Sequence, residues 1–327
     1  MRVLTINSHE SYISNLACID EIELTIIDQM TGRYTEKWDE RIRKIPENAK
    51  LVTMSEAIKS KWSFDVFIGH NLTDIRDSKP FKLPSVMIIH STLDGLLLTQ
   101  SPSYSRDEIH KILQAYVNLT NVLPVAVSTL KAKSWGITDC PIIPFYIDGN
   151  IFQGYKGTIA AGLRVANQLV EKGAILEIDM FGALIEGENF NLIGHNPVLG
   201  ISSAANQEEL VEAYQSHRYY IHTAAPNMED GYNTASLEAM AVGMPIICNN
   251  HSSAPVEDGV HGFKSDDIDY LRTKIKLLDE DQELARQLGA NGRQYVLEHH
   301  SLDTFKTLWL DVLEQAVETA RGDNLTR

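Results

Sequence analysis

The sequence predicts two tandem α/β domains, each built on a doubly wound parallel sheet. A chain of 327 residues is longer than one typical core needs, which favours two domains of about 150 residues each. Short apolar strand segments alternate with helical segments in both halves, as in parallel sheets wrapped by helices. Near residue 150 the sequence becomes rich in glycine and poor in charge, which is typical of a connection between domains. We therefore predict an N-terminal domain over 1–150 and a C-terminal domain over 151–327.

Apolar runs in the first half predict six strands. They lie at 2–7, 23–28, 65–70, 85–90, 124–128 and 141–145. Two of these runs end in polar groups, at His70 followed by Asn71 and at His90 followed by Ser91. Ligands of open parallel sheets bind beyond the carboxyl ends of the strands, so both ends are candidate ligand positions.

The second half repeats the alternation and ends in a helical tail that begins near residue 267. Strands are predicted at 163–169, 190–194, 219–223 and 245–249, and helices at 173–185 and 206–217. In the tail, apolar side chains recur at helical spacing, and we interpret this stripe as core packing. Its members are Leu302, Phe305, Leu308, Trp309, Val312 and Leu313.

Charge and cysteine content exclude several classes of protein. The net charge of −15 disfavours nonspecific binding to nucleic acid, because phosphates are repelled overall. The three cysteines, Cys18, Cys140 and Cys248, form no CxxC pair, which favours a reducing compartment and disfavours structural zinc. No apolar run reaches the length of a membrane span, and the first residues read as a strand rather than a signal peptide. We expect a cytoplasmic protein.

The stretch EDGYNTASLEAMAVGMP at 229–245 is the most informative motif. A helix is predicted to begin near Tyr232 or Asn233, to run through Met240 and to end at Gly243. The backbone N–H groups of its first turn have no partners of their own and attract anions such as a diphosphate. Gly231 would allow the backbone to approach a ligand closely.

Two acids frame this helix. Asp230 lies just before it and Glu238 follows eight residues later, a little over two turns along, so both carboxylates can project toward the same side. In the simpler interpretation, Asp230 caps the helix and Glu238 is a solvated surface acid.

The complete pattern resembles the retaining glycosyltransferases of family 4, of the group 1 type, which have the GT-B fold. Members carry two acids separated by seven residues in a context like EGFGxxxLEAMAxGxPVV. Glu229 offers a rival register, but the glycine and aromatic residue that follow Asp230 select Asp230. The chain departs from the family pattern because Asp stands at the first acidic position. The resemblance implies two Rossmann-like domains facing across a cleft, with an acceptor-binding N-terminal domain, a donor-binding C-terminal domain and C-terminal helices.

Further segments carry the same resemblance. LRVANQLVEKGAIL at 163–176 is similar to the family's strand, loop and helix, and it matches Lys172 to the lysine that contacts the donor diphosphate. Asn167 stands at the family's arginine position, so Arg164, Lys156 or a backbone N–H would have to compensate. SSAPVEDGVHGF and IIPFYID also look like family segments. The first domain matches more loosely, since Ser8, His9 and Glu10 replace the usual Gly-Gly loop.

The resemblance implies a role for each matched residue. The donor is a nucleotide-diphosphate sugar, and no further cofactor is expected. Asp230 would hold hydroxyls of the transferred sugar, Glu238 the ribose hydroxyls, and Lys172 the diphosphate. His90 would face the sugar, and transfer would proceed with retention. The donor-binding set is completed by Asn167, Arg164, Gly231, Tyr232, Asn233 and Thr234.

No metal site is predicted. The string DID at 267–269 could suggest metal-binding acids, but its position before a helical segment favours helix capping. The histidines at 251, 299 and 300 lack ligand-like spacing with cysteines or acids.

Alternative functions and the acceptor stay open at this level. A sugar-nucleotide epimerase or phosphorylase on the same fold, or a noncatalytic glycan-binding or regulatory subunit, would share these motifs. The acceptor could be a glycan, a lipid-linked sugar or a small molecule. The segment 37–46, with Trp38 among basic residues, suggests peripheral contact with an anionic membrane or a solvated helix face. The oligomeric state is not predicted.

Overall fold

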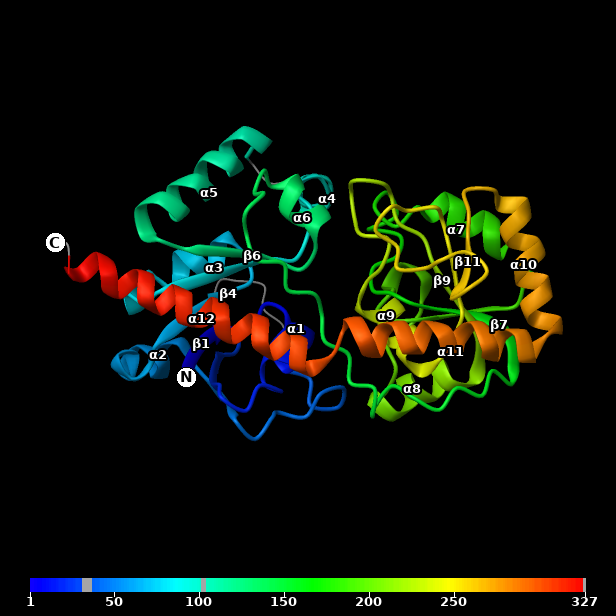
Figure 1. The fold of residues 1–327 in the computed structure, drawn as a ribbon, viewed down its shortest axis with the longest axis horizontal. Coiled ribbons are helices and arrows are strands. Elements are labelled where there is room, and N and C mark those ends of the chain that lie inside the picture. The colour runs from blue at the N-terminus through cyan, green and yellow to red at the C-terminus, as the bar shows by residue number, and fades with distance from the viewer. Residues whose placement is uncertain (31–36, 101–103, 326–327) are drawn as a thin grey trace. The chain divides into compact units, whose positions relative to one another are not determined.

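The computed structural model describes residues 1–30, 37–100 and 104–325, and the chain divides into two compact units (Figure 1). The first unit comprises Met1–Leu93, Gln100–Tyr146 and Leu302–Arg327, and the second comprises Asp94–Thr99 and Ile147–Ser301. The sequence-based division assigned everything after residue 150 to one domain. The last helix, α12 (Leu302–Leu325), instead belongs to the first unit.

The apolar stripe of α12 explains this placement. Phe305, Trp309, Val312 and Leu313 are buried, and the Trp309 indole Nε1 donates a hydrogen bond to the Tyr12 hydroxyl at 3.2 Å. The prediction that this stripe packs in a core is confirmed. The core is that of the first unit, since α12 contacts strands of its sheet.

The first unit has a six-stranded parallel sheet in the order β3-β2-β1-β4-β5-β6. Its strands are β1 (Arg2–Ile6), β2 (Glu23–Ile27), β3 (Ala49–Val52), β4 (Val66–Gly69), β5 (Ser85–Ile89) and β6 (Leu123–Ala126). Five of them were predicted from apolar runs. The run at 141–145 was wrongly predicted as a strand, because it forms only one bridge, from Ile142 to Ala126.

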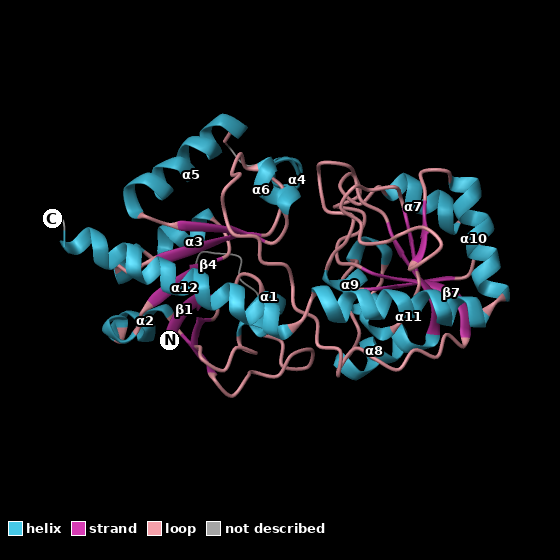
Figure 2. Cartoon of the chain, in the orientation of Figure 1, coloured by secondary structure: helices cyan, strands magenta, loops and turns pink. Residues whose placement is uncertain are grey.

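Helices lie between most consecutive strands of the first unit, as the alternation predicts, but none is found between β2 and β3 in the described residues (Figure 2). They are α1 (Glu10–Leu16), α2 (Met54–Lys59), α3 (Leu72–Asp77), α5 (Arg106–Thr120) and α6 (Thr129–Ser134), and α4 (Leu93–Gln100) lies largely in the second unit. Local capping sets several starts: Thr53 and Ser105 form capping boxes, and Asn71 and Ser128 accept from the first turn.

The second unit has a five-stranded parallel sheet in the order β11-β10-β9-β7-β8. Its strands are β7 (Ile159–Val165), β8 (Phe190–Ile193), β9 (His217–His222), β10 (Ile246–Cys248) and β11 (Gly262–Lys264). The strand predicted at 163–169 exists, but it begins earlier and ends at Val165. The chain then leaves the sheet through Gln168, whose φ of 56° is left-handed.

Among the described residues, five further α-helices belong to the second unit, in addition to most of α4. They are α7 (Ile178–Ile185), α8 (Gln207–Ser216), α9 (Thr234–Val242), α10 (Ile268–Glu280) and α11 (Gln282–His299). The helix predicted from residue 173 begins only at Ile178, because turns occupy the preceding residues and Glu177 has a left-handed φ of 49°. Asp267 caps α10 by accepting from the Tyr270 N–H, which confirms helix capping at 267–269.

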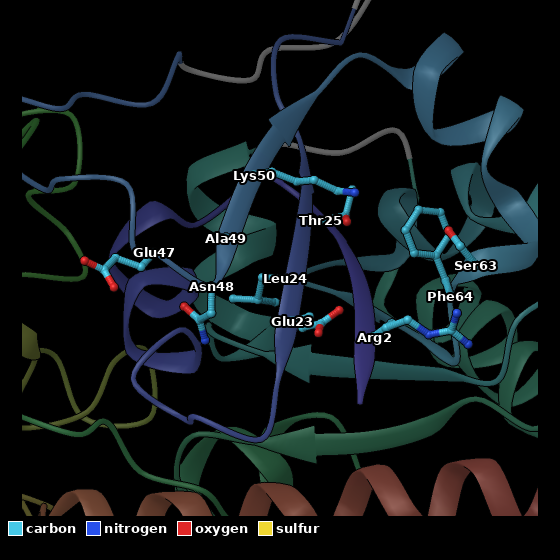
Figure 3. Close-up of a pocket in the computed structure, with 10 residues that line it drawn as sticks. All are labelled: Arg2, Glu23, Leu24, Thr25, Glu47, Asn48, Ala49, Lys50, Ser63 and Phe64. Carbon is cyan, nitrogen blue, oxygen red and sulfur yellow. The ribbon is translucent and has the colours of Figure 1, made fainter.

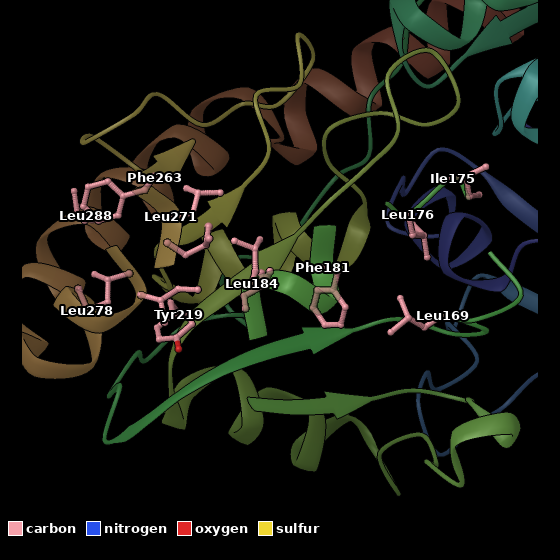
Figure 4. Close-up of a cluster of buried hydrophobic side chains, with 14 residues drawn as sticks. Leu169, Ile175, Leu176, Phe181, Leu184, Tyr219, Phe263, Leu271, Leu278 and Leu288 are labelled. Atoms are coloured by element: carbon pink, nitrogen blue, oxygen red, sulfur yellow. The ribbon is translucent and has the colours of Figure 1, made fainter. Parts of the chain in front are cut away.

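Apolar side chains from the sheet and the surrounding helices form the core of the second unit (Figure 4). Leu184 of α7, Ile221 of β9, and Leu271 and Ile275 of α10 are almost completely buried there. The helices are thereby fixed over the sheet, and the loops at the carboxyl ends of the strands have a rigid base.

Close packing of α11 against the end of α9 makes Gly289 a stability determinant. A Cβ atom at residue 289 would collide with the backbone carbonyl of Gly243, the left-handed residue that ends α9. We expect Gly289→Ala to reduce the free energy of unfolding by about 1–3 kcal/mol in urea denaturation. Gly182→Ala in α7 is the matched control, because nothing lies within 4 Å of its Cβ position. That variant should be neutral or more stable by about 0.5–1 kcal/mol. Equal effects of the two substitutions would contradict the packing argument.

Candidate functional site

The carboxyl ends of three neighbouring strands bring three histidines of the first unit together. The strand order reverses between β1 and β4, which makes their carboxyl ends the switch point where ligands of doubly wound sheets bind. His9 follows β1, His70 follows β4 and His90 follows β5. The sequence indicated His70 and His90 as separate strand ends, but the sheet order places them beside each other and adds His9.

The three imidazoles are in direct contact. The rings of His9 and His90 stack with centroids 4.1 Å apart, and His70 Nδ1 lies 2.9 Å from His90 Nε2. Tyr12 meets His90 edge-on at 5.0 Å. The stacked His9 ring and the edge-on Tyr12 ring therefore both restrict rotation of the His90 ring.

The histidine cluster is uncharged at neutral pH. Burial lowers the pKa of His70 to about 3. Burial also lowers the pKa of His9 to about 3 and that of His90 well below its usual range, with the neighbouring imidazoles adding to both shifts. Neutral imidazoles each offer one N–H donor and one lone-pair acceptor.

In the second unit, the structure confirms the helix predicted within the 229–245 motif. Helix α9 runs over Thr234–Val242, with Asn233 as N-cap and Gly243 in a left-handed C-cap. Asn233 Oδ1 accepts from the Ser236 N–H, and Ser236 Oγ accepts from the Asn233 N–H, so the two form a capping box. Asn233, not Asp230, is the capping residue.

Both motif acids are buried. Asp230 is 1% exposed and Glu238 is 5% exposed, so Glu238 is not the solvated surface acid of the simpler interpretation. The Tyr214 hydroxyl of α8 donates to Glu238 Oε2 at 3.0 Å. Burying a carboxylate costs folding free energy unless the carboxylate is hydrogen-bonded or paired. The burial of these two carboxylates therefore indicates that each has a structural partner or binds a ligand.

The reason for a glycine at residue 231 differs from the expectation. A Cβ there would lie 2.7 Å from His251 Cβ and 2.8 Å from the Ala254 nitrogen. The Gly231 N–H donates to Ser253 Oγ at 2.9 Å. The space beside Gly231 is therefore filled by the 251–254 loop of the chain itself, and the glycine permits this packing rather than a close approach by a ligand.

His251 lies beside the motif, which the sequence did not predict. It follows β10 and is 3% exposed, and its Nδ1 accepts from the Ser253 N–H at 3.1 Å. Its Nε2 is buried and has no hydrogen-bond partner within the described part of the chain. Only the contact with Gly231 reveals that His251 adjoins the motif, since the two are twenty positions apart in sequence.

The residues expected at the diphosphate lie in the loops after β7. Lys172 is half-buried in the turn before α7, and Asn167 is exposed. Asn167 Oδ1 accepts from the His195 N–H at 2.8 Å, so this side chain ties the loop after β7 to the loop after β8. Asn196 completes the connection by accepting from the Leu169 N–H and donating to the Ala166 carbonyl, both at 2.7 Å.

Arg164 has a mainly structural environment. It is 1% exposed and donates to Thr223 Oγ1 at 2.9 Å and to the Thr223 carbonyl at 3.2 Å. Its guanidinium stacks over the Phe181 ring at 4.5 Å. Burial lowers the pKa of Arg164 to about 10, so it stays charged at neutral pH. These contacts connect β7, the end of β9 and α7, and they do not favour Arg164 as the substitute for the missing arginine at 167.

Two other surfaces of the first unit are separate from these residues. The Trp38 indole, expected near a membrane, is 3% exposed and donates to the Arg43 carbonyl at 2.7 Å, so its ring packs inside the unit. A pocket lined by Arg2, Glu23 and Ser63, among others, opens at the amino ends of β1, β2 and β3 (Figure 3). It contains none of the predicted site residues.

The described residues form neither a metal-ligand cluster nor a membrane-spanning helix. Among residues 1–30, 37–100 and 104–325, no group of three or more His, Cys, Asp or Glu side chains is arranged so that it could hold a metal ion. Within the same ranges, no helix has the length and apolarity to cross a membrane.

The second half of the chain is similar to known glycosyltransferases. Residues 178–311 match the family model described as "Glycosyl transferase-like". Over 131 residues, the chain is 29% identical to the MMP alpha-(1->4)-mannosyltransferase of Mycolicibacterium hassiacum. Over 165 residues, it is 25% identical to the capsular polysaccharide biosynthesis glycosyltransferase CapM of Staphylococcus aureus. These matches cover 38% and 46% of the chain but only 31% and 42% of the two relatives.

Solved structures extend the likeness over the whole chain. HepE of Anabaena, solved with UDP and glucose, has a TM-score of 0.67 at 14% identity, covering 96% of this chain and 100% of that one. Sucrose-phosphate synthase of Thermosynechococcus elongatus gives 0.69 at 12% identity, with 98% and 100% covered. The protein therefore has the GT-B fold, and its second half is similar to glycosyltransferases.

The buried neutral state of His70 predicts a pH-dependent stability. Its pKa is about 3 in the folded protein and about 6.5 when unfolded, so the unfolded chain binds the extra proton below pH 6.5. The stabilisation is complete above pH 6.5 and is lost as the pH falls toward 3. Between pH 7 and pH 5, His70 alone should cost about 2 kcal/mol of unfolding free energy, measured by urea denaturation. His70→Asn should show a smaller loss over this interval, and an unchanged pH dependence in that variant would contradict the assignment.

Proposed function

We propose that the protein is a retaining glycosyltransferase. It would move a hexose from a nucleotide-diphosphate sugar to a hydroxyl group of a glycan, lipid-linked or small-molecule acceptor. The observation that carries the proposal is the burial of Asp230 and Glu238 around a helix that starts at the carboxyl end of a doubly wound sheet. The glycosyltransferase-like match over 178–311 includes both acids.

Glu238 is proposed to accept hydrogen bonds from the ribose of the nucleotide. A carboxylate has about four acceptor sites on two oxygens, and the Tyr214 hydroxyl donates to Oε2 of this one. The Tyr214 bond also fixes the orientation of the carboxylate. UDP is the first nucleotide to test, because HepE was solved with it.

The diphosphate is proposed to lie between Lys172 and the start of α9. The capping box uses the N–H groups of Asn233 and Ser236, and Gly231 donates to Ser253. The N–H groups of Thr234 and Ala235, in the first helical turn, are outside these bonds and lie at the positive end of the helix dipole. Fixed positive potential from these groups and Lys172 would stabilise the charge that grows on the leaving diphosphate, without a metal ion.

Asp230 and His90 are proposed to act on the transferred sugar. Asp230 would position its hydroxyls, and the neutral imidazole of His90 would orient the ring and support the positive charge of an oxocarbenium-like transition state. Both carboxylates are then committed to the donor, and the leaving phosphate oxygen becomes the base that takes the acceptor proton. That oxygen stays beside the face of the sugar ring from which the diphosphate departs. The acceptor therefore attacks the anomeric carbon from the same face.

Removing the Glu238 charge should weaken nucleotide binding. Glu238→Gln keeps the shape of the side chain and an acceptor for Tyr214, but it removes the charged acceptor for the ribose. We expect a loss of about 1.5–3 kcal/mol in UDP binding, measured by isothermal titration calorimetry. Glu212→Ala, at an exposed position of the neighbouring helix α8, is the control and should bind like the parent. Unchanged affinity in Glu238→Gln would remove Glu238 from the ribose site.

The stereochemical outcome tests the mechanism. With an α-linked nucleotide sugar, the proposed front-face attack should give an α-linked product, followed through the anomeric proton signal by NMR during turnover. His90→Ala should slow transfer without altering this outcome, because the imidazole is not the base. A β-linked product would overturn the retaining mechanism. Recovery of an isomerised nucleotide sugar would instead indicate an epimerase. Donor binding without any reaction would indicate a noncatalytic subunit.

A further inference from the structure

We propose that Thr5 and His70 act as positioning residues that fix the tautomer of His90, so that His90 Nδ1 faces the transferred sugar as a hydrogen-bond acceptor. The inference rests on the proposed function for its substrate, a sugar hydroxyl. The relay itself is defined by hydrogen bonds within the first unit, from β1 through β4 to β5.

The direction of the relay is set at Thr5. Its Oγ1 is 2.9 Å from the Ile68 carbonyl, and a carbonyl can only accept, so the single hydroxyl proton of Thr5 is donated there. Thr5 Oγ1 is also 3.1 Å from His70 Nε2. Because the hydroxyl has no second proton, this contact is a hydrogen bond only if His70 Nε2 carries the proton and donates.

The same logic continues to His90. A neutral His70 with its proton on Nε2 has a bare Nδ1, which can only accept. His70 Nδ1 lies 2.9 Å from His90 Nε2, so His90 Nε2 must be the donor. In a neutral His90, the proton on Nε2 leaves Nδ1 as a lone pair. The reverse tautomers would point two lone pairs at each other between Thr5 and His70.

His90 Nδ1 is the one end of this relay that the chain leaves unsatisfied. Within the described residues, the atom is buried and has no hydrogen-bond partner. Stacking of His9 at 4.1 Å and edge contact of Tyr12 at 5.0 Å restrict rotation of the ring. A buried, oriented acceptor is best satisfied by a ligand that donates, and a sugar hydroxyl does so.

The relay specifies what His90 can do chemically. An imidazole with a bare Nδ1 accepts from a hydroxyl and directs electron density toward the reacting sugar, which suits a transition state with positive charge on the ring. It cannot donate a proton from that atom. His90 thus binds the sugar through its acceptor side, and Thr5 and His70 determine which side that is.

The tautomers can be measured directly. Long-range proton–nitrogen NMR of the full chain with 15N-labelled histidine separates the two neutral tautomers by their nitrogen shifts, and His70→Asn and His90→Ala assign the signals. We expect the Nε2-protonated form for both His70 and His90, and a change in the His90 Nδ1 shift when a nucleotide sugar is added. A proton on His90 Nδ1, or no change at Nδ1 with bound donor, would overturn the proposal.

Matched variants test the effect on turnover. Thr5→Val keeps the shape of this fully buried side chain but removes the acceptor for His70, whereas Thr5→Ser retains it. We expect Thr5→Val to mix the tautomers of His70 and His90 and to lower kcat about three- to tenfold, the loss of one hydrogen bond. UDP affinity should be unchanged, because Thr5 does not touch the nucleotide. Thr5→Ser should stay within about twofold of the parent in both measurements.

A second pair of variants tests His70. His70→Asn can place a carbonyl oxygen near the original Nδ1 and so keep an acceptor for His90, whereas His70→Leu cannot. We expect kcat to be partly restored in His70→Asn relative to His70→Leu, with thermal melting used to confirm that both fold. Equal kcat in His70→Asn and His70→Leu would overturn the relay. So would a Thr5→Val variant that keeps the full kcat of the parent and a single tautomer of each histidine. If the parent protein transfers no sugar, the proposed function fails, while the tautomer measurement still decides the relay.

Discussion

Polar groups that leave water must find hydrogen-bond partners, and this requirement organises the carboxyl ends of both sheets. Polar side chains are buried at or just beyond the carboxyl ends of several strands, such as His70 after β4 and His222 at the end of β9. Buried polar groups of this region depend on partners from other parts of the fold: Arg164 on Thr223, Glu238 on Tyr214 and His70 on Thr5. The loops are therefore held by specific bonds rather than by apolar packing alone.

The second unit shows how such bonds create a defined surface from irregular backbone. Asn249, after β10, exchanges two hydrogen bonds with Ala224, after β9, at 3.1 and 2.9 Å. Asn196 and Asn167 do the same for the loops after β7 and β8. Because amides donate and accept at once, each asparagine joins two loops that are far apart in sequence. The start of α9 is positioned within this network through Gly231 and Ser253.

What the sequence could predict was mostly local. Helix α9 was predicted to within a residue or two because its signals, Asn233 at the start and Gly243 before Pro245 at the end, lie within the segment itself. Strand β3 was missed because no residue of its AKLV segment is fully buried, so no apolar run marks it. The position of α12 in the first unit could not be read from its stripe, since periodicity shows which face is buried but not against which partner.

The candidate site divides in the same way. The acids of the motif could be selected as candidates from the family resemblance, whereas the packing at Gly231 depends on His251 and Ala254, which only the fold brings near. The His9, His70 and His90 cluster likewise follows from strand order, because residues after β1, β4 and β5 become neighbours only when these strands are adjacent. The sequence thus indicated candidate residue types, and the topology determined which of them lie together.

The charge distribution gives these two groups of residues complementary chemistry. Under the proposed function, the net charge of −15 would repel an anionic donor at long range, so binding would depend on local positive potential and on surfaces that add no further negative charge. The histidine cluster meets the second condition because burial keeps its imidazoles neutral. A neutral acceptor can also support a sugar with partial positive charge without forming the ion pair that a carboxylate would form with it. Under the proposed function, the first unit therefore contributes orientation and lone pairs, and the second contributes the fixed charges that hold and stabilise the nucleotide.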